Sequence, residues 1–187
     1  EESSVEGISE TIEWPEYHEE EFFKSVPLIV RARVEKRVRQ LKDADLSTQK
    51  KEAVTEYAVE IIDTIKDERP SPNPRILLVQ PGNSEFRYEG FPLLEVNKEY
   101  VLFLEEGFLA GKKQWMLTAP YSLYFIQGDR MVQGVSGSPT DHIWEDYGDF
   151  KRRVQKILGI AAEETPEKAK KDKSTPASSD EEGEQKR

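Results

Sequence analysis

Two stretches decide the fold of this chain of 187 residues: residues 28–40, LIVRARVEKRVRQ, and residues 53–66, AVTEYAVEIIDTIK. In each, apolar and polar side chains alternate with period two, which predicts a long strand that is buried on one side only. In the first strand, the expected core side consists of Val30, Ala32, Val34 and Val38. The charged side of that strand consists of Arg31, Arg33, Glu35, Arg37 and Arg39. In the second strand, the expected core side consists of Tyr57, Val59, Ile61 and Ile65.

Shorter segments around these two strands complete a mainly-β pattern. Residues 43–51 are polar and predict a loop, and the prolines of residues 68–75 predict an extended connection. We expect further strands at residues 76–80, 100–104, 114–119, 123–127 and 131–133, the last two joined as a hairpin by Gly128-Asp129. Five to seven strands of this kind fit a small antiparallel barrel, closed or partly closed.

A helix is expected at each end of this strand region. Residues 16–24 predict a short helix that ends before Pro27. The C-terminal helix is expected at residues 146–158, because apolar residues recur there at helical spacing and Gly159 is a suitable C-cap. The apolar residues of this amphipathic helix are Tyr147, Phe150, Val154, Ile157 and Leu158.

The formal charge of -10 is concentrated at the two ends of the chain. Residues 1–23 contain nine acids and no base, and residues 163–187 contain eight acids and six bases. The remaining 20 acids and 21 bases give residues 24–162 a net charge of +1, so the overall charge does not exclude an anionic partner. We expect an acidic flexible leader at residues 1–16, one domain at 17–160, and a disordered Lys/Glu/Ser/Pro tail at 161–187.

Several classes of protein are excluded by what the chain lacks. Without cysteine it has no disulfide scaffold, thiolate metal site, iron–sulfur cluster or cysteine nucleophile. No run of about 18 apolar residues is present, so no membrane-spanning segment is expected. The chain begins at Glu1 rather than Met, which leads us to expect that an export signal has been removed.

Five segments carry a resemblance to a known group of domains: FFKSVPLIVRARV (22–34), YAVEIIDTIK (57–66), ILLVQPG (76–82), FPLLEVNKEYVLFLEE (91–106) and DFKRRVQKIL (149–158). Over about residues 17–160 the chain resembles the OB-like barrels, related to netrin-like domains, of predicted extracytoplasmic proteins of unknown function, many from Gram-positive bacteria. The resemblance implies an OB-like barrel and an extracytoplasmic location, secreted or lipid-anchored, but no particular activity. Netrin-like metalloproteinase inhibitors chelate zinc through an N-terminal cysteine, and this chain cannot do so.

The first candidate binding site is the arginine face formed by Arg31, Arg33, Arg37 and Arg39. Barrels of this type can bind single-stranded nucleic acid through a basic groove with stacking aromatics. The alternative, which we favour, is that Arg33 and Arg37 pair with Glu56 and Glu60 on the neighbouring strand. A third interpretation is that an acidic segment, such as residues 1–23 of the same chain, docks on this face.

The second candidate is an apolar loop with Phe86, Tyr88 and Phe91, which could form an interaction surface or cap the end of the barrel. The aromatic residues that could add to it are Trp115, Tyr121, Tyr124 and Phe125.

Two further clusters are weaker candidates for a functional site. Residues 134–138, GVSGS, lack the second glycine of a nucleophile elbow because Ser138 stands in its place. The acidic cluster of Asp141, His142, Glu145, Asp146 and Asp149 suits the start of a helix better than a metal site.

No catalytic residue, metal ligand or cofactor is assigned from these patterns. We expect a monomeric, non-enzymatic, extracytoplasmic binding module whose partner is a protein or a cell-surface component. One alternative is a barrel that binds single-stranded nucleic acid or another polyanion. A weaker alternative is a metal-dependent hydrolase.

Overall fold

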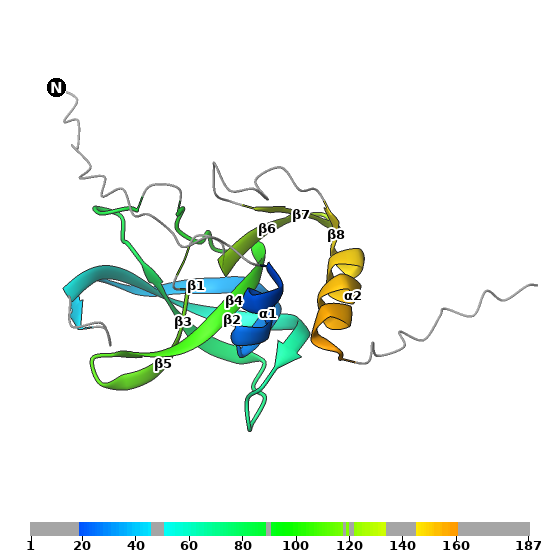
Figure 1. Cartoon of the computed structure of the whole chain (residues 1–187). Coiled ribbons are helices and arrows are strands. Elements are labelled where there is room, and N and C mark those ends of the chain that lie inside the picture. The colour runs from blue at the N-terminus through cyan, green and yellow to red at the C-terminus, as the bar shows by residue number, and fades with distance from the viewer. Residues whose placement is uncertain are drawn as a thin grey trace, which may run out of the picture.

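The chain forms a partly closed β-barrel with a helix at each end (Figure 1). The computed structural model describes residues 19–45, 51–88, 91–117, 119, 122–133 and 145–160, so the predicted leader and tail lie outside the described residues. The elements in chain order are α1 (Glu19–Ser25), β1 (Leu28–Asp45), β2 (Lys51–Asp67), β3 (Arg75–Pro81), β4 (Glu99–Leu109), β5 (Lys112–Met116), β6 (Leu123–Gln127), β7 (Arg130–Gln133), β8 (Glu145–Asp146) and α2 (Tyr147–Leu158).

The barrel is a ring of five strands in the order β1-β2-β3-β5-β4, closed by pairing of β4 with β1. Neighbouring strands in this ring are antiparallel except β3 and β5, which run parallel through two pairs, Leu78 with Trp115 and Val79 with Met116. The mainly-β barrel with flanking helices is confirmed, but it is not purely antiparallel. The short seam leaves the ring partly open, as in the five-stranded OB barrels.

Strands β6, β7 and β8 extend the sheet beyond β4 and bring the total to eight, one more than the upper expectation. The excess is β8, a strand of two residues. The predicted hairpin of β6 and β7 is confirmed, with Gly128 at its turn in the left-handed region at a φ of 63°. Part of the predicted loop at residues 43–51 is wrong, because β1 continues to Asp45 and β2 begins at Lys51.

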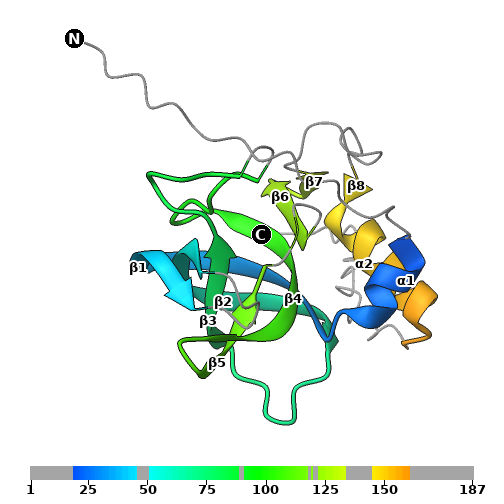
Figure 2. The ribbon, with the colours of Figure 1, turned by 60° about the vertical axis from the view of Figure 1, so that its left-hand side comes forward.

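Side chains fill the barrel, and a second apolar cluster attaches the helices to its outside. The interior includes Val30, Ala32, Val34, Tyr57 and Val59, as the alternation of the two long strands predicts. Both helices lie on the same side of the barrel (Figure 2). There the fully buried Phe23 of α1 stacks on Phe103 of β4 at 5.6 Å, and Phe150 of α2 packs edge-on against both rings.

The ends of both helices are fixed by specific polar contacts. Asp146 accepts a hydrogen bond from the backbone N of Asp149 as the N-cap of α2, and Gly159 adopts the left-handed conformation as its C-cap, so the expected capping is confirmed. The buried ammonium of Lys66 donates to the carbonyl oxygens of Phe23 and Lys24 at 3.3 and 2.9 Å. Lys66 thereby satisfies carbonyls at the C-terminal end of α1 that have no partner within the helix.

A third apolar cluster joins the far ends of β1 and β2 to the hairpin of β4 and β5. Its buried members are Ala44, Val54, Val79, Leu109 and Met116. Gly107 of β4 allows this close packing, since a Cβ at that position would lie 2.0 Å from the sulfur of Met116. The hairpin therefore covers one end of the outward surface of β2 and β3 and leaves the other end open.

Candidate functional site

Of the five register shifts along β1, the two between Val34 and Lys36 and between Arg37 and Arg39 determine which of its charged side chains share a face. The residues opposite Arg33, Lys36 and Arg39 are Glu60, Ala58 and Glu56, so β1 advances three residues for every two of β2. Extra residues of this kind are β-bulges, which bend a strand and change the direction of its side chains. The outward side chains of β1 consequently recur with period three from Arg33 to Arg39.

The bulges overturn part of the predicted alternation. Arg37 lies opposite the fully buried Tyr57 and not opposite an outward glutamate, so it does not share a face with Arg33 and Arg39. Burial raises the pKa of Tyr57, and the neighbouring Arg37 guanidinium opposes that rise. Val38, expected in the core, is 42% exposed. The period-two alternation therefore ends at the bulge between Val34 and Lys36.

The outward residues of β1 continue in register across β2 and β3. Glu60 pairs with Arg75, Ala58 with Leu77, and Glu56 with Val79. Because residues directly opposite each other in a sheet point to the same side, the three strands share one outward surface. We call this surface the outer face. It consists of three rows, each with one residue from β1, β2 and β3 in that order. The first row is Arg33, Glu60 and Arg75, the middle row is Lys36, Ala58 and Leu77, and the third row is Arg39, Glu56 and Val79.

Carboxylates of neighbouring strands hold most of the arginines of β1. Glu99 of β4 accepts from Arg31 Nε at 2.9 Å and from Arg33 Nη2 at 2.7 Å. Burial acts to raise the pKa of Glu99, but the hydrogen bonds from both arginines outweigh it and hold this pKa below its usual value. Arg39 Nε donates to the buried Glu56 at 3.2 Å. Cross-strand pairing is thus present, with Glu99 rather than Glu60 as the ion-pair partner of Arg33.

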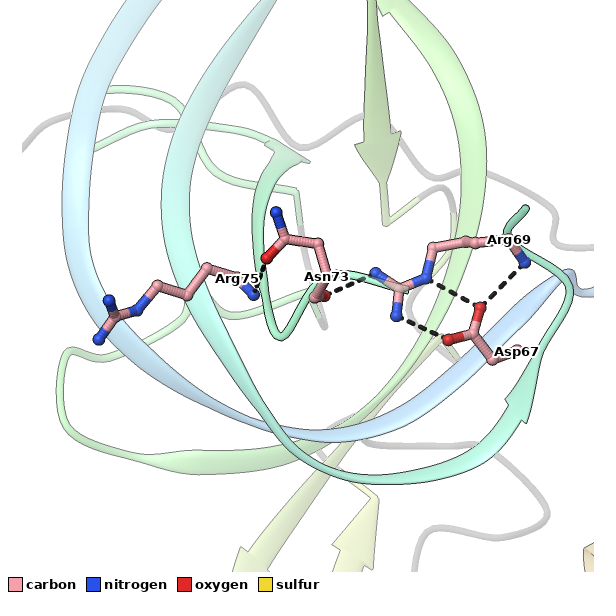
Figure 3. Close-up of polar contacts among 4 residues, drawn as sticks. All are labelled: Asp67, Arg69, Asn73 and Arg75. Atoms are coloured by element: carbon pink, nitrogen blue, oxygen red, sulfur yellow. Dashed lines mark hydrogen bonds and ion pairs between the residues drawn. The ribbon is translucent and has the colours of Figure 1, made fainter. Parts of the chain in front are cut away.

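The connection between β2 and β3 positions the first residue of β3. Arg69 donates from Nε and Nη2 to Asp67 at 2.8 and 2.6 Å and from Nη1 to the carbonyl of Asn73 at 2.8 Å (Figure 3). The Asn73 side chain in turn accepts from the backbone N of Arg75 at 2.9 Å. Arg75 then reaches Glu35 of β1, with 3.1 Å between Arg75 Nε and Glu35 Oε1.

The outer face is balanced in charge and has an unengaged centre. Its four cations, Arg33, Lys36, Arg39 and Arg75, are matched by Glu35, Glu56, Glu60 and Glu99 on or beside it. In the middle row, Leu77 at the β3 end is 43% exposed, and the exposed Lys36 at the β1 end has no ion-pair partner among the described residues. A neutral surface with a small apolar centre and a charged rim suits a partner that offers both apolar and polar groups better than it suits a polyanion.

The apolar loop lies over one end of the barrel. Phe91 is 2% exposed and belongs to the interior cluster, so it is not part of an exposed surface. The buried Gln80 side chain ties the loop down by donating to the carbonyl of Pro92 at 2.7 Å and accepting from the backbone N of Leu94 at 3.0 Å. Phe86 and Tyr88 are half-buried, with ring centroids 5.1 Å apart.

The other aromatics named with this loop are dispersed. Trp115 and Phe125 are partly buried against the barrel interior. Tyr124 is buried beneath the helices, and Tyr121 lies outside the described residues. The structure therefore does not gather these residues and the loop into one exposed patch within the described part of the chain.

The acidic cluster before α2 divides into structural roles. Glu145 lies in β8 and accepts from Arg153 at 3.2 and 3.0 Å, Asp146 caps the helix, and Asp149 pairs with Arg152. Asp141, His142 and residues 134–138 lie outside the described residues. In the described ranges, no group of three or more His, Cys, Asp or Glu residues is placed to hold a metal ion, and no helix is long and apolar enough to span a membrane.

No family model, curated protein or solved structure matches this chain. The basis for a function is therefore the outer face. Two of the residues that shape it, Arg75 and Leu77, were not singled out in the sequence, and Lys36 is a basic residue of the first strand that was not assigned to its arginine face. Residues 34–39 contain no glycine or proline that would mark a bulge.

Proposed function

We propose that this protein is a non-enzymatic binding module whose outer face contacts a protein partner. The observation that supports it is the middle row of the outer face, where Leu77 is exposed and the ion-paired arginines of the two neighbouring rows form a rim. Protein interfaces combine an apolar centre with a polar rim, and arginine is enriched in them. The outer face has this composition on a small scale.

The ion pairs of the rim favour binding for a second reason. Arg33, Arg39 and Arg75 are each already held by a carboxylate, at 2.7, 3.2 and 3.1 Å. Side chains that are ordered before association lose less conformational entropy when a partner arrives. A partner that contacts Leu77 and forms hydrogen bonds with the rim would meet side chains that are already paired.

The test uses a photoreactive residue at position 77 and a matched control at position 62. Leu77 and Ile62 are 43% and 42% exposed, but only Leu77 belongs to the outer face. In cells that produce the protein, we expect a discrete cross-linked species from position 77 that is absent from position 62. The species should disappear when Lys36→Glu is added. Equal cross-linking from both positions, or none from position 77, would contradict the proposal.

The runner-up function is binding of a single-stranded nucleic acid or another polyanion. It is favoured by the row of Arg33, Lys36 and Arg39, which the bulges place on one face. It is opposed by the equal number of carboxylates there. Titration of labelled single-stranded DNA at low salt separates the two proposals, because phosphate contacts produce a steep dependence of affinity on salt. Tight, salt-sensitive binding that Lys36→Glu abolishes would replace a protein partner with a polyanion.

The extracytoplasmic location is a proposal that rests on the family resemblance. We expect the full-length protein to be recovered outside the cytoplasm when cells that produce it are fractionated. Recovery in the cytoplasm together with a cytoplasmic marker would contradict this part of the proposal and leave the outer face unaffected.

A further inference from the structure

A pocket of about 390 Å³ lies apart from the centre of the outer face, where the start of β4 meets the β6–β7 hairpin. Its volume is within the range of small-molecule sites, and the mouths of β-barrels are frequent places for such sites. Its lining combines an apolar floor, formed mainly by Tyr100, Phe125 and Val132, with a polar rim that includes Glu95, Lys98 and Gln127.

The floor is a single row of side chains across three strands. Tyr100 of β4 lies opposite Phe125 of β6, and Phe125 lies opposite Val132 of β7. The rings of Tyr100 and Phe125 have centroids 5.2 Å apart and are tilted by 52°. Tyr100 is fully buried and supports Phe125, whose ring is half-buried. A ligand in the pocket would therefore contact mainly Phe125.

The rim is held rigidly above this floor. The Tyr100 hydroxyl accepts a hydrogen bond from the backbone N of Glu95 at 2.8 Å. The same turn is tied to β1 by two bonds, from Asn97 N to the carbonyl of Val34 at 2.8 Å and from Val34 N to the carbonyl of Lys98 at 3.0 Å. These contacts fix the backbone from which the Glu95 and Lys98 side chains extend.

The rim side chains are available for hydrogen bonds to a ligand. Glu95, Lys98 and Gln127 are exposed, and neither Glu95 nor Lys98 has an ion-pair partner among the described residues. Together they offer a carboxylate acceptor, an ammonium donor and an amide that does both. Glu99, which also lines the pocket, has its charge compensated by Arg31 and Arg33.

We propose that this pocket binds one neutral sugar ring. The C–H face of the ring packs on Phe125, and its hydroxyls donate to Glu95 and accept from Lys98 or Gln127. A purely apolar ligand would cover part of the rim. The rim groups that it covers would then lose their hydrogen bonds to water without gaining others, which is unfavourable. An anion would face the carboxylate of Glu95, which no described cation compensates. This site is additional to the proposed protein contact on the outer face.

The test is an NMR titration of the isotopically labelled full chain with glucose and with N-acetylglucosamine. We expect saturable shift changes, in the millimolar range, confined to the backbone amides near Glu95–Tyr100 and in the β6–β7 hairpin. Glucuronate should bind more weakly than glucose. The variants Phe125→Leu and Lys98→Met should each weaken binding, the first by about tenfold. Leu77→Ala, on the outer face, is the matched control and should bind as the wild type does.

Three results would overturn the proposal. The first is the absence of saturable shifts with either neutral sugar. The second is unchanged affinity in Phe125→Leu or in the exposed variant Lys98→Met, which removes a rim donor without touching the core. The third is tighter binding of glucuronate than of glucose, which would identify an anion site.

Discussion

Replacement of Glu99 by glutamine tests whether the arginines of β1 are held within the fold. The Glu99 carboxylate accepts from Arg31 and Arg33, and its side chain is 21% exposed. Glutamine keeps the size and shape of the side chain but removes its charge. The half-buried Arg31 guanidinium, which also lies 5.0 Å from the ring centroid of Tyr147, would then lack its carboxylate.

The expected loss of stability follows from the burial of the pair. Hydrogen bonds to charged groups contribute about 1.5–3 kcal/mol, and solvent-exposed ion pairs contribute at most about 1 kcal/mol. Arg31 and Glu99 are 22% and 21% exposed, so we place their pair at the lower end of the first range and count nothing for the exposed Arg33. The variant Glu99→Gln should therefore lose about 1.5–2 kcal/mol, which lowers Tm by about 3–8 °C.

Urea unfolding followed by tryptophan fluorescence measures this loss. The matched control is Glu106→Gln, because Glu106 pairs with Lys113 between side chains that are 43% and 59% exposed. The control should change the free energy of unfolding by no more than about 0.5 kcal/mol. If Glu99→Gln is no more destabilising than Glu106→Gln, the arginines are not held as described. A gain in affinity for single-stranded DNA in Glu99→Gln would show that freed arginines can meet an anion.

Two further predictions concern pH and packing. Hydrogen bonds from Arg69 lower the pKa of Asp67 from its usual value of 3.8. Burial acts to raise the pKa of Asp63, but hydrogen bonds from Lys151 and Tyr147 outweigh it and lower this pKa from 3.8 as well. Both carboxylates therefore stabilise the fold fully at pH values above 3.8, and the free energy of unfolding should fall as the pH drops below 3.8. The variant Asp67→Asn should make this decline less steep. If denaturant titrations at several acidic pH values give the same decline in the free energy of unfolding for the variant and the wild type, the prediction is wrong. Gly107→Ala should cost about 1–3 kcal/mol by overpacking against Met116, and unchanged thermal unfolding would contradict it.

The elements that local sequence defines were predictable. The alternation through Val34 placed one side of β1 in the barrel, and Asp146 with Gly159 defined the ends of α2. Each of these features depends on a periodicity or a cap whose chemistry is contained within a few neighbouring residues. The expected mainly-β barrel with two helices followed from the same local patterns.

The outer face was not predictable, because it depends on partners far away in the chain. A period-two reading placed Arg37 beside Arg33 and Val38 in the core, whereas the bulges turn Arg37 to the row of Tyr57 and leave Val38 exposed. The partner of Arg33, Glu99, lies 66 residues away on a strand whose position only the closed ring defines. No local signal in residues 34–39 specifies either feature.

Burial of the apolar loop also could not be read from composition. Phe91 could have capped the barrel or faced the solvent, and the hydrogen bonds of Gln80 to the loop decide in favour of a cap. Gln80 itself lies at the end of an apolar strand and carries no sequence signal for this role. A buried polar side chain that satisfies a loop backbone is visible only in three dimensions.

The bulged register of β1 is the central claim, and engineered cysteines test it most directly, because the chain has no cysteine of its own. The structure places Arg39 opposite Glu56; an unbulged strand continuing from the Arg33–Glu60 pair would place Arg37 there. Opposed residues have Cα atoms about 4.5–5.5 Å apart, which suits a disulfide. On mild oxidation the Arg39→Cys/Glu56→Cys variant should cross-link and the Arg37→Cys/Glu56→Cys variant should not. The reverse result would contradict the bulged register and the outer face built on it.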